Sequence, residues 1–407
     1  MTDQQAAEPL FGDALFRQKR KKGKFRTVNP PRLESAVADT HAHVHLLPDP
    51  ALALAQCAVW GVEFVCDIVD IQEDDAPAVF AHLREWPHEA QARLADVIER
   101  SEESLAAMAG GAPAAGGDAQ GVAGDDPVPA NAAALGGLPG CVGSTDPASP
   151  AAVSGCGALP PGALTHLPDK ADPAAFALPA DAANRPIPHL RIAVGCHPHN
   201  AKFYDDALEA QLMRQLADPR VCAVGEIGLD YHYDLSPRDA QREAFRRQIR
   251  IAHATGLPVA LHVREAHDEA FRILQEEGFP EGGTLLHCFD LDWATVAPWV
   301  EVGCFIALGG ALTFGRCEDT REAVARIPER QLLTETDSPY MTPEPMRGMT
   351  CGPAHTVFTA ARMAEVLGCD AGAQRDRLLR ELMANARGLL DREPTAWQRE
   401  QGKERSE

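Results

Sequence analysis

Eight short runs of apolar and β-branched residues recur along the chain, and segments with helical periodicity separate them. Near-continuous apolar runs that alternate with helices are typical of parallel strands buried on both faces of a sheet. Eight such units are the number that closes a (β/α)8 barrel. The sequence therefore predicts an α/β fold of the TIM type, with strands at residues 35–40, 62–69, 191–196, 221–226, 258–262, 284–287, 304–308 and 332–337.

One of the intervening helices has clear start and stop signals. Ser236 is the expected N-cap, Pro237 the first helical residue and Asp239 the partner in a capping box. Gly256 and Pro258 mark its end. Between these signals the apolar residues Phe245, Ile249 and Ala252 follow helical spacing.

The barrel sequence is interrupted once, between the second and third expected strands. In residues 105–185, 48 of the 81 residues are Ala, Gly or Pro, so this segment lacks the apolar residues for a core of its own and is expected to be a long insertion. We expect the barrel in residues 35–104 and 186–392, an N-terminal arm in 1–34 and a charged tail in 393–407. Without the insertion and the ends, roughly 280 residues remain, close to the usual barrel size of about 250.

The chain is acidic overall, with a formal net charge of −21. A broad electropositive surface for nucleic acid is therefore excluded, and only local basic features are left to hold phosphate. Residues 17–26 are such a feature, with seven basic side chains and no acid. We expect them to form a mobile arm, which is either a solvated tail or a contact for nucleic acid or another polyanion.

Neither a membrane segment nor an export signal is evident in the sequence. No stretch reaches about 18 uninterrupted apolar residues, and the N-terminus has no apolar region before a cleavage site. The 11 cysteines are scattered and form no C-x-x-C pair, which favours reduced thiols. We therefore expect a cytoplasmic protein without a membrane contact, and no obligate protein partner is evident.

Metal-ligating residue types gather where the expected strands end. Active sites of (β/α)8 barrels lie at the carboxyl ends of the strands, so these side chains should converge on one pocket. Four imidazoles and two carboxylates suit zinc or manganese, and they suffice for two cations if one carboxylate bridges them. Any single histidine among them could equally be a structural hydrogen-bonding residue, but their coincidence at successive strand ends favours a metal site. The candidates are His41, His43, Glu226, His262, His287 and Asp337, with Glu226 as the bridge.

These motifs together resemble the TatD-type metal-dependent deoxyribonucleases of the metallo-amidohydrolase group. The resemblance rests on DTHAHVH (39–45), GCHPHN (195–200), GEIGLDY (225–231), LPVALHVREA (257–266), LLHCF (285–289), ETDSPY (335–340), PEPMRG (343–348) and NARGLL (385–390). It implies one cation held by His41, His43, Glu226 and Asp337, and a second held by Glu226, His262 and His287. It also implies hydrolysis of DNA phosphodiesters, often from a 3′ end, with Mg²⁺, Mn²⁺ or Zn²⁺.

The catalytic and substrate-binding residues can be proposed on this map. Glu226 and Asp337 are the catalytic candidates, with Asp337 as a ligand that also takes a proton from water. His197, Arg264 and Arg347 are the candidates for substrate contact, because guanidinium groups match phosphate oxygens in pairs. Each of the two arginines could instead form a structural ion pair.

The chain departs from the family pattern at two places where substrate contacts are expected. Asp290 and Leu291 follow HCF where the family usually has Ser-Gly, and Cys351 replaces the Asn after Arg-Gly. The alternative function is therefore hydrolysis of an ester or amide by the same two-metal site, for example an aminoacyl-tRNA ester. A metal-held scaffold that binds a partner through the insertion and the basic arm is a further, non-enzymatic alternative.

Overall fold

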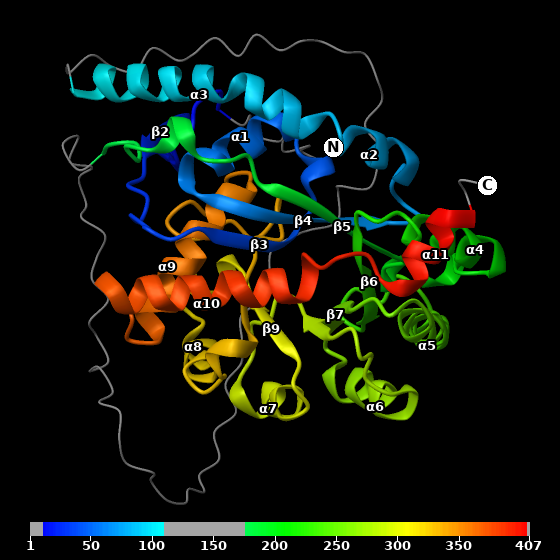
Figure 1. The fold of residues 1–407 in the computed structure, drawn as a ribbon. Helices are drawn as coiled ribbons and strands as arrows, with labels where there is room; N and C mark the ends of the chain where they lie inside the picture. Colours follow the sequence, from blue (N-terminus) through cyan, green and yellow to red (C-terminus); the bar gives the residue numbers. More distant parts are fainter. Residues whose placement is uncertain (1–10, 110–175, 405–407) are drawn as a thin grey trace, which may run out of the picture.

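The structure, a computed structural model, describes residues 11–109 and 176–404. In this part of the chain, eight parallel strands form one sheet in chain order, from β3 to β10 (Figure 1). The strands are β3 (Val37–Ala42), β4 (Val62–Asp70), β5 (His189–Gly195), β6 (Val221–Asp230), β7 (Val259–Arg264), β8 (Thr284–Leu286), β9 (Phe305–Leu308) and β10 (Leu332–Thr334). Each overlaps one of the eight expected runs, so the predicted TIM-type barrel is confirmed.

The first and last strands of this sheet meet and bring the barrel close to closure. The Thr334 hydroxyl donates a hydrogen bond to the Ala38 carbonyl (2.7 Å), and the Thr40 hydroxyl donates to the Thr334 carbonyl (3.0 Å). Just after β10, the Asp337 N–H donates to the carbonyl of His41 in β3 (2.8 Å). Residues from opposite ends of the chain therefore lie side by side at the rim.

Helices cover the outside of the sheet, and their apolar faces pack against it. None of them in the described residues is long and apolar enough to cross a bilayer. They are α1 (Pro50–Trp60), α2 (Ala76–His82), α3 (Trp86–Ala109), α4 (Asp206–Leu216), α5 (Arg238–Thr255), α6 (His267–Glu277), α7 (Trp293–Glu301), α8 (Glu318–Val324), α9 (Thr356–Val366), α10 (Gly372–Leu390) and α11 (Ala396–Glu404).

Helix α10 packs at the amino-terminal end of the barrel. Its residues Met383, Ala386 and Leu389 belong to the same apolar cluster as Phe64 and Leu285. The Asn385 amide donates to the carbonyl of Leu332, the first residue of β10 (2.9 Å). This end is closed by apolar packing, so the polar strand ends form the open face at the other end.

Part of the expected N-terminal arm has regular structure. Residues 17–27 form an antiparallel hairpin of β1 (Arg17–Arg20) and β2 (Lys24–Thr27). Phe16, at its base, is buried against Trp60 and Phe358. These residues of the expected arm therefore have regular structure, and an apolar contact between residues far apart in sequence anchors them in the core.

Regular structure is also present at the limits of the expected insertion and within the expected tail. Helix α3 continues past residue 104 to Ala109, and residues 176–185 include a short 3-10 turn, while residues 110–175 lie outside the described part. In the tail, α11 is helical, and the buried Gln398 amide donates to the carbonyls of Leu216 (2.9 Å) and Val221 (3.0 Å).

The predicted helix at residues 237–255 is confirmed as α5, but its N-cap is not Ser236. The structure places Pro237 at the cap, without a side-chain cap hydrogen bond. The Ser236 hydroxyl instead donates to the His199 carbonyl (2.6 Å) and accepts from Lys202 N (3.1 Å). A tertiary contact has replaced the local capping box. Gly256 ends the helix with its backbone in the left-handed region, as predicted, because glycine adopts this conformation more easily than other residues.

Candidate metal centre

The two histidines that end β3 both reach the open face of the barrel. His41 is fully buried, and its Nε2 lies 3.5 Å from Glu226 Oε2 and 3.8 Å from Asp337 Oδ1. His43 Nε2 lies 3.5 Å from Asp337 Oδ1. The Nδ1 of His43 lies 3.0 Å from the Ile68 carbonyl, which can only accept, so Nδ1 carries a proton and Nε2 is the ring nitrogen available to a cation in the site.

Glu226, in β6, lies at the centre of the cluster. Its Oε1 is 2.8 Å from His262 Nδ1 and 3.0 Å from His287 Nε2, while its Oε2 faces His41. Burial by itself raises the pKa of this carboxyl, but the imidazoles of His287, His41 and His197 hold the pKa well below its usual value. Glu226 is therefore an anion whose two oxygens face two different groups of imidazoles.

His262, in β7, is oriented by a buried carboxylate of the neighbouring strand. Its Nε2 lies 3.0 Å from Asp230 Oδ2, and its Nδ1 faces Glu226. Burial lowers the pKa of His262, but the hydrogen bonds to Asp230 and Glu226 outweigh burial and raise the pKa to about 9. Because the deprotonated imidazole is the metal ligand, a cation would displace a proton here.

His287, which follows β8, is held between two carboxylates. Its Nε2 faces Glu226 and its Nδ1 lies 3.4 Å from Glu335 Oε1. Glu335 is itself fixed, because its Oε1 accepts a hydrogen bond from the Cys288 N–H (2.6 Å). The His287 ring also stacks on that of His41, with centroids 3.7 Å apart. The position of this ring therefore depends on residues from three other parts of the barrel: β6, the end of β10 and β3.

Asp337 lies just after β10 in the left-handed region, with φ +59°. Asp tolerates this conformation better than most residues do. Burial raises the pKa of Asp337, but His43, His287 and His41 outweigh burial and lower it. The loop is held in place by the buried Asp39, which accepts hydrogen bonds from the Thr336 N–H (2.9 Å) and hydroxyl (2.6 Å).

The donor set fits divalent cations. Ligand atoms of His41, His43 and Glu226 lie within 4.8 Å of one another, as do those of Glu226, His262 and His287. Neither ring nitrogen of the fully buried His41 has a hydrogen-bond partner within the described residues. Burial, followed by His287, lowers the pKa of His41, so its ring is neutral and has a lone pair to offer. Two ligand pockets that share Glu226 therefore lie side by side.

Among the substrate-contact candidates, His197 lies at this cluster. Its Nε2 is 3.8 Å from Glu226 Oε1, and its ring centroid is 4.5 Å from that of His262. The His197 N–H donates to Asp70 Oδ2 (2.7 Å). Burial raises the pKa of Asp70 to about 6. His197 thus stands where a group bound beside Glu226 would meet it.

The two arginine candidates lie in different surroundings. Arg264, the last residue of β7, is half-buried with its guanidinium 4.8 Å from the Tyr233 ring centroid. Arg347 is exposed and stacks 4.1 Å from the Phe314 ring centroid. Of the two positions that depart from the family pattern, Asp290 is exposed, whereas Cys351 is fully buried. A substrate contact at Cys351 therefore stays a prediction.

Two carboxylates that orient ligands, Asp230 and Glu335, were missed by reasoning from the sequence. Their signal is the strand period of two, since Asp230 is four residues after Glu226 and Glu335 two before Asp337. The side chain of His45, in the same motif as His41 and His43, is also buried and lies 3.0 Å from Asp67 and 3.2 Å from Asp74. Its carboxylate partners could not be read from the sequence.

Comparison with known proteins decides the family. The model of the family described as "TatD related DNase" matches residues 167–390, just over half of the chain. This chain belongs to the TatD family. It is 37% identical over 174 residues to the uncharacterized metal-dependent hydrolase YabD of Bacillus subtilis, covering 43% of this chain and 68% of that protein. It is 39% identical over 180 residues to the uncharacterized metal-dependent hydrolase TatD of Mycobacterium tuberculosis, with the same coverage.

A third relative carries a more specific name. The chain is 32% identical over 177 residues to the human 3′-5′ RNA nuclease TATDN2, covering 43% of this chain and 23% of that protein. Together, these relatives and the family match make the TatD-family chain a metal-dependent hydrolase.

Solved structures of the family share the fold. The Escherichia coli TatD homologue YJJV aligns with a TM-score of 0.53 and 20% identity, over 88% of this chain and 98% of its own. A TatD-family hydrolase of Entamoeba histolytica aligns with a TM-score of 0.54 and 13% identity, over 88% of this chain and 99% of its own. The family-model match begins after β3 and β4, so the placement of His41 and His43 beside Glu226 rests on the tertiary structure.

Proposed function

We propose that this TatD-family chain is a two-metal phosphodiesterase that shortens single-stranded DNA from its 3′ end. The observation that carries the proposal is the position of Glu226, whose two oxygens face His41 on one side and His262 with His287 on the other. A single carboxylate between two groups of imidazoles is the arrangement that a bridged pair of cations requires. In this proposal, His43 and Asp337 complete the first group.

Divalent cations bound there would polarise the scissile phosphoryl group and make water more acidic. Asp337 is the general base, because it is ionised at neutral pH and one face of its carboxylate is turned toward His41 and His43. Its side chain is 17% exposed, so water can reach it. No protein nucleophile is needed.

The surrounding side chains orient the substrate. His197 lies near Glu226 and offers an imidazole to a phosphate oxygen. Arg264, at the end of β7, and Arg347, in the loop after β10, are the proposed phosphate contacts farther along the strand. The name of the human relative, a 3′-5′ RNA nuclease, supports the proposed end and the nucleic-acid class.

The decisive experiment is cleavage of end-labelled single-stranded DNA by metal-stripped protein to which Mg²⁺, Mn²⁺ or Zn²⁺ is restored. Glu226→Gln is the test variant, and Glu322→Gln, an exposed carboxylate of α8, is the matched control. We expect metal-dependent shortening by the wild type and by the control, and none by Glu226→Gln. Bound metal is measured in parallel. The wild type and the control should hold two ions per chain, and Glu226→Gln should hold fewer.

The result that would overturn the proposal is equal activity, or equal inactivity, of the wild type and Glu226→Gln on DNA. If both are inactive while the wild type still binds two cations, the substrate is wrong. Aminoacyl-tRNA esters and amides are then the substrates to assay with the same three proteins.

A further inference from the structure

The hairpin of residues 17–27 is a basic projection on an acidic protein. The side chains of Arg20, Lys21 and Lys24 are exposed near its turn, and Phe25 is 41% exposed beside them. The segment from Arg17 to Thr27 contains no acidic residue, whereas the whole chain carries a net charge of −21. The metal cluster contains no Lys or Arg, so this hairpin is a separate source of positive charge.

The base of this basic hairpin is firmly anchored. Asp13 pairs with Arg17 (2.5 Å) and accepts a hydrogen bond from Ser104 of α3 (2.9 Å). The Trp60 indole N–H donates to the Ala14 carbonyl (2.6 Å). The Val28 N–H donates to the Phe16 carbonyl and continues the pairing of the two strands. The basic hairpin is therefore held in a defined direction by contacts with α1 and α3.

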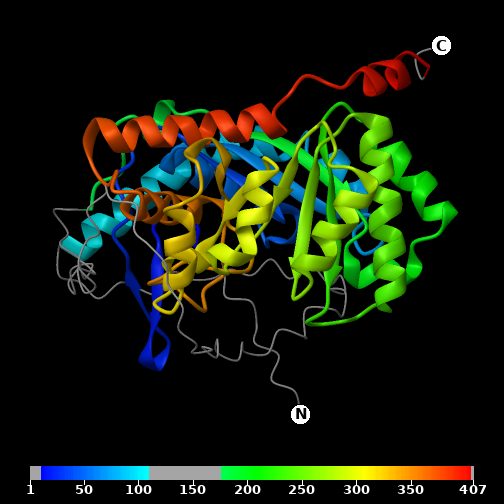
Figure 2. The ribbon, with the colours of Figure 1, turned by 90° about the horizontal axis from the view of Figure 1, so that it is seen from below.

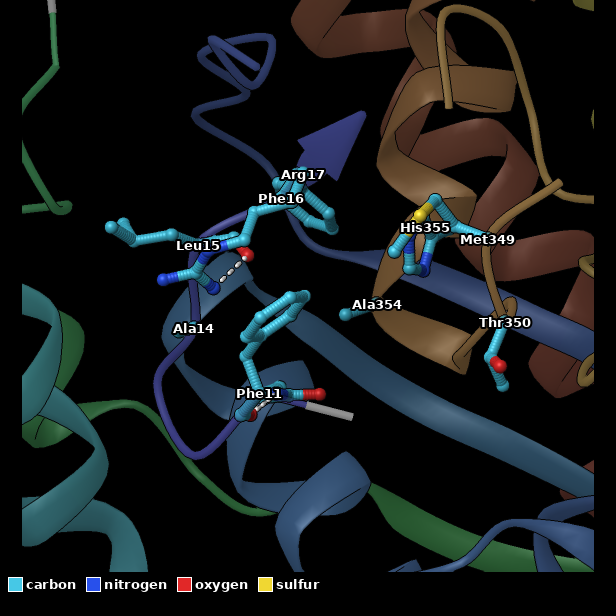
Figure 3. Close-up of a pocket in the computed structure, with 10 residues that line it drawn as sticks. Phe11, Ala14, Leu15, Phe16, Arg17, Met349, Thr350, Ala354 and His355 are labelled. Atoms are coloured by element: carbon cyan, nitrogen blue, oxygen red, sulfur yellow. Dashed lines mark hydrogen bonds between the residues drawn. The ribbon is translucent and has the colours of Figure 1, made fainter. Parts of the chain in front are cut away.

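The loop after β10 connects the hairpin base to the metal centre. Figure 3 shows residues from Phe11 to Arg17 on one side of a pocket, and Met349, Thr350, Ala354 and His355 on the other. The Cys351 N–H, in the same loop, donates to the carbonyl of Pro339 (3.1 Å), two residues after Asp337. The hairpin base and Asp337 thus flank the same loop.

The basic hairpin also points to the correct side of the barrel. In Figure 2, α10, which covers the amino-terminal strand ends, lies along the top, and the hairpin projects at the bottom, on the side of the carboxyl ends. Four residues per strand at about 3.3 Å each carry its tip roughly 13 Å beyond its base. The tip therefore stands out beside the open face that contains the metal centre.

We propose that the basic hairpin binds the sugar–phosphate backbone of the single-stranded nucleic acid whose end lies at the metal centre. This inference rests on the proposed function, since it assigns a second contact to the same substrate. Exposed Lys and Arg bind phosphates and release counterions, and an exposed aromatic ring beside them can stack on a base. The hairpin thus holds the strand several nucleotides away from the bond that is cleaved.

The test replaces Arg20→Gln, Lys21→Gln and Lys24→Gln together in the full chain. The matched control is Arg330→Gln, Arg399→Gln and Lys403→Gln, which removes three exposed charges from the 3-10 helix Glu329–Gln331 and from α11. Binding of a fluorescent single-stranded DNA of about 20 nucleotides is measured by anisotropy in EDTA at several salt concentrations. Circular dichroism and thermal unfolding confirm that each variant is folded.

We expect the hairpin variant to bind DNA more weakly and its log affinity to depend less on log salt, with a slope smaller by about 2 for three lost phosphate contacts. The control should match the wild type in both. Phe25→Ala should weaken binding without changing the salt slope. With metal restored, KM for the long strand should rise in the hairpin variant, while cleavage of a dinucleotide, too short to reach the hairpin, should be unchanged.

Wild-type affinity and salt slope in the hairpin variant would overturn this inference, as would an equal loss in the control. Such a result leaves the proposed function intact if the wild type still cleaves DNA and Glu226→Gln does not. Conversely, hairpin-dependent binding without Glu226-dependent cleavage would refute the proposed function alone. Absence of any DNA binding by the wild type in EDTA would refute the inference, and absence of cleavage after metal is restored would refute the proposed function.

Discussion

Replacement of Asp230 by Asn should weaken cation binding at His262 although Asp230 is not itself a proposed ligand. Asp230 Oδ1 accepts hydrogen bonds from the N–H groups of His232 (3.0 Å) and Tyr233 (2.8 Å). In Asp230→Asn these bonds keep the amide oxygen in place, so the amide nitrogen occupies the Oδ2 position. A donor then faces His262 Nε2, which is a donor in the wild type. The imidazole proton moves to Nδ1, toward Glu226, where the lone pair for a cation should be.

The magnitude follows from the kind of contact that is lost. Replacement of a carboxylate that orients a ligating histidine typically lowers metal affinity by about 10- to 100-fold, which corresponds to about 1.4–2.7 kcal/mol of binding free energy. The assay is titration of metal-stripped protein with Zn²⁺ or Mn²⁺ against a chelating indicator, with circular dichroism to confirm folding. We expect one of the two binding steps to weaken by this factor and the other to change little.

His199→Gln is the matched control for Asp230→Asn. His199 Nε2 also contacts Asp230 Oδ2 (2.9 Å), and a Gln amide can donate to the same oxygen while His262 keeps its acceptor. The reasoning is refuted if Asp230→Asn binds both cations like the wild type. It is equally refuted if His199→Gln weakens binding as much as Asp230→Asn does.

Two further predictions concern stability. Phe64→Ala removes a fully buried ring from the apolar cluster inside the barrel, and it should lower the free energy of unfolding by about 3–5 kcal/mol in urea denaturation of metal-free protein; a loss below about 1 kcal/mol would show that the ring is not tightly packed. Burial lowers the pKa of His355 to about 4, so below its unfolded pKa of about 6.5 the unfolded chain binds a proton that the folded chain does not. The free energy of unfolding therefore decreases as the pH decreases in this window, and His355→Gln should make its loss between pH 7 and pH 4.5 smaller by about 2–3 kcal/mol. Unfolding curves of both proteins at the two pH values measure this loss, and an equal loss in both would contradict the prediction.

The barrel and its metal-binding residue types could be predicted because both signals are local. Each strand is a short apolar run, and donors such as His41, Glu226 and Asp337 stand in the carboxyl-terminal half of a strand or just after it. In a parallel barrel these ends meet by geometry alone, whatever the chain does between them. The sequence was therefore sufficient for the eight strands and for the composition of the cluster.

Contacts between residues far apart in the chain could not be predicted in this way. Ser236 has the pattern of an N-cap, yet its hydroxyl bonds to His199, because tertiary packing offered a better acceptor. The polar run of the hairpin gave no sign of structure, since its anchor is the burial of Phe16 against Trp60 and Phe358.

The metal centre shows the same division. Residue types at strand ends indicated which side chains could bind a cation. The direction in which each ring points depends on Asp230 for His262 and Glu335 for His287. Asp230 comes from the neighbouring strand β6, and Glu335 comes from the residue after β10, two strands away from β8. A hydrogen bond has a narrow range of distance and angle that only folded neighbours can satisfy, so ligand orientation is a property of the tertiary structure.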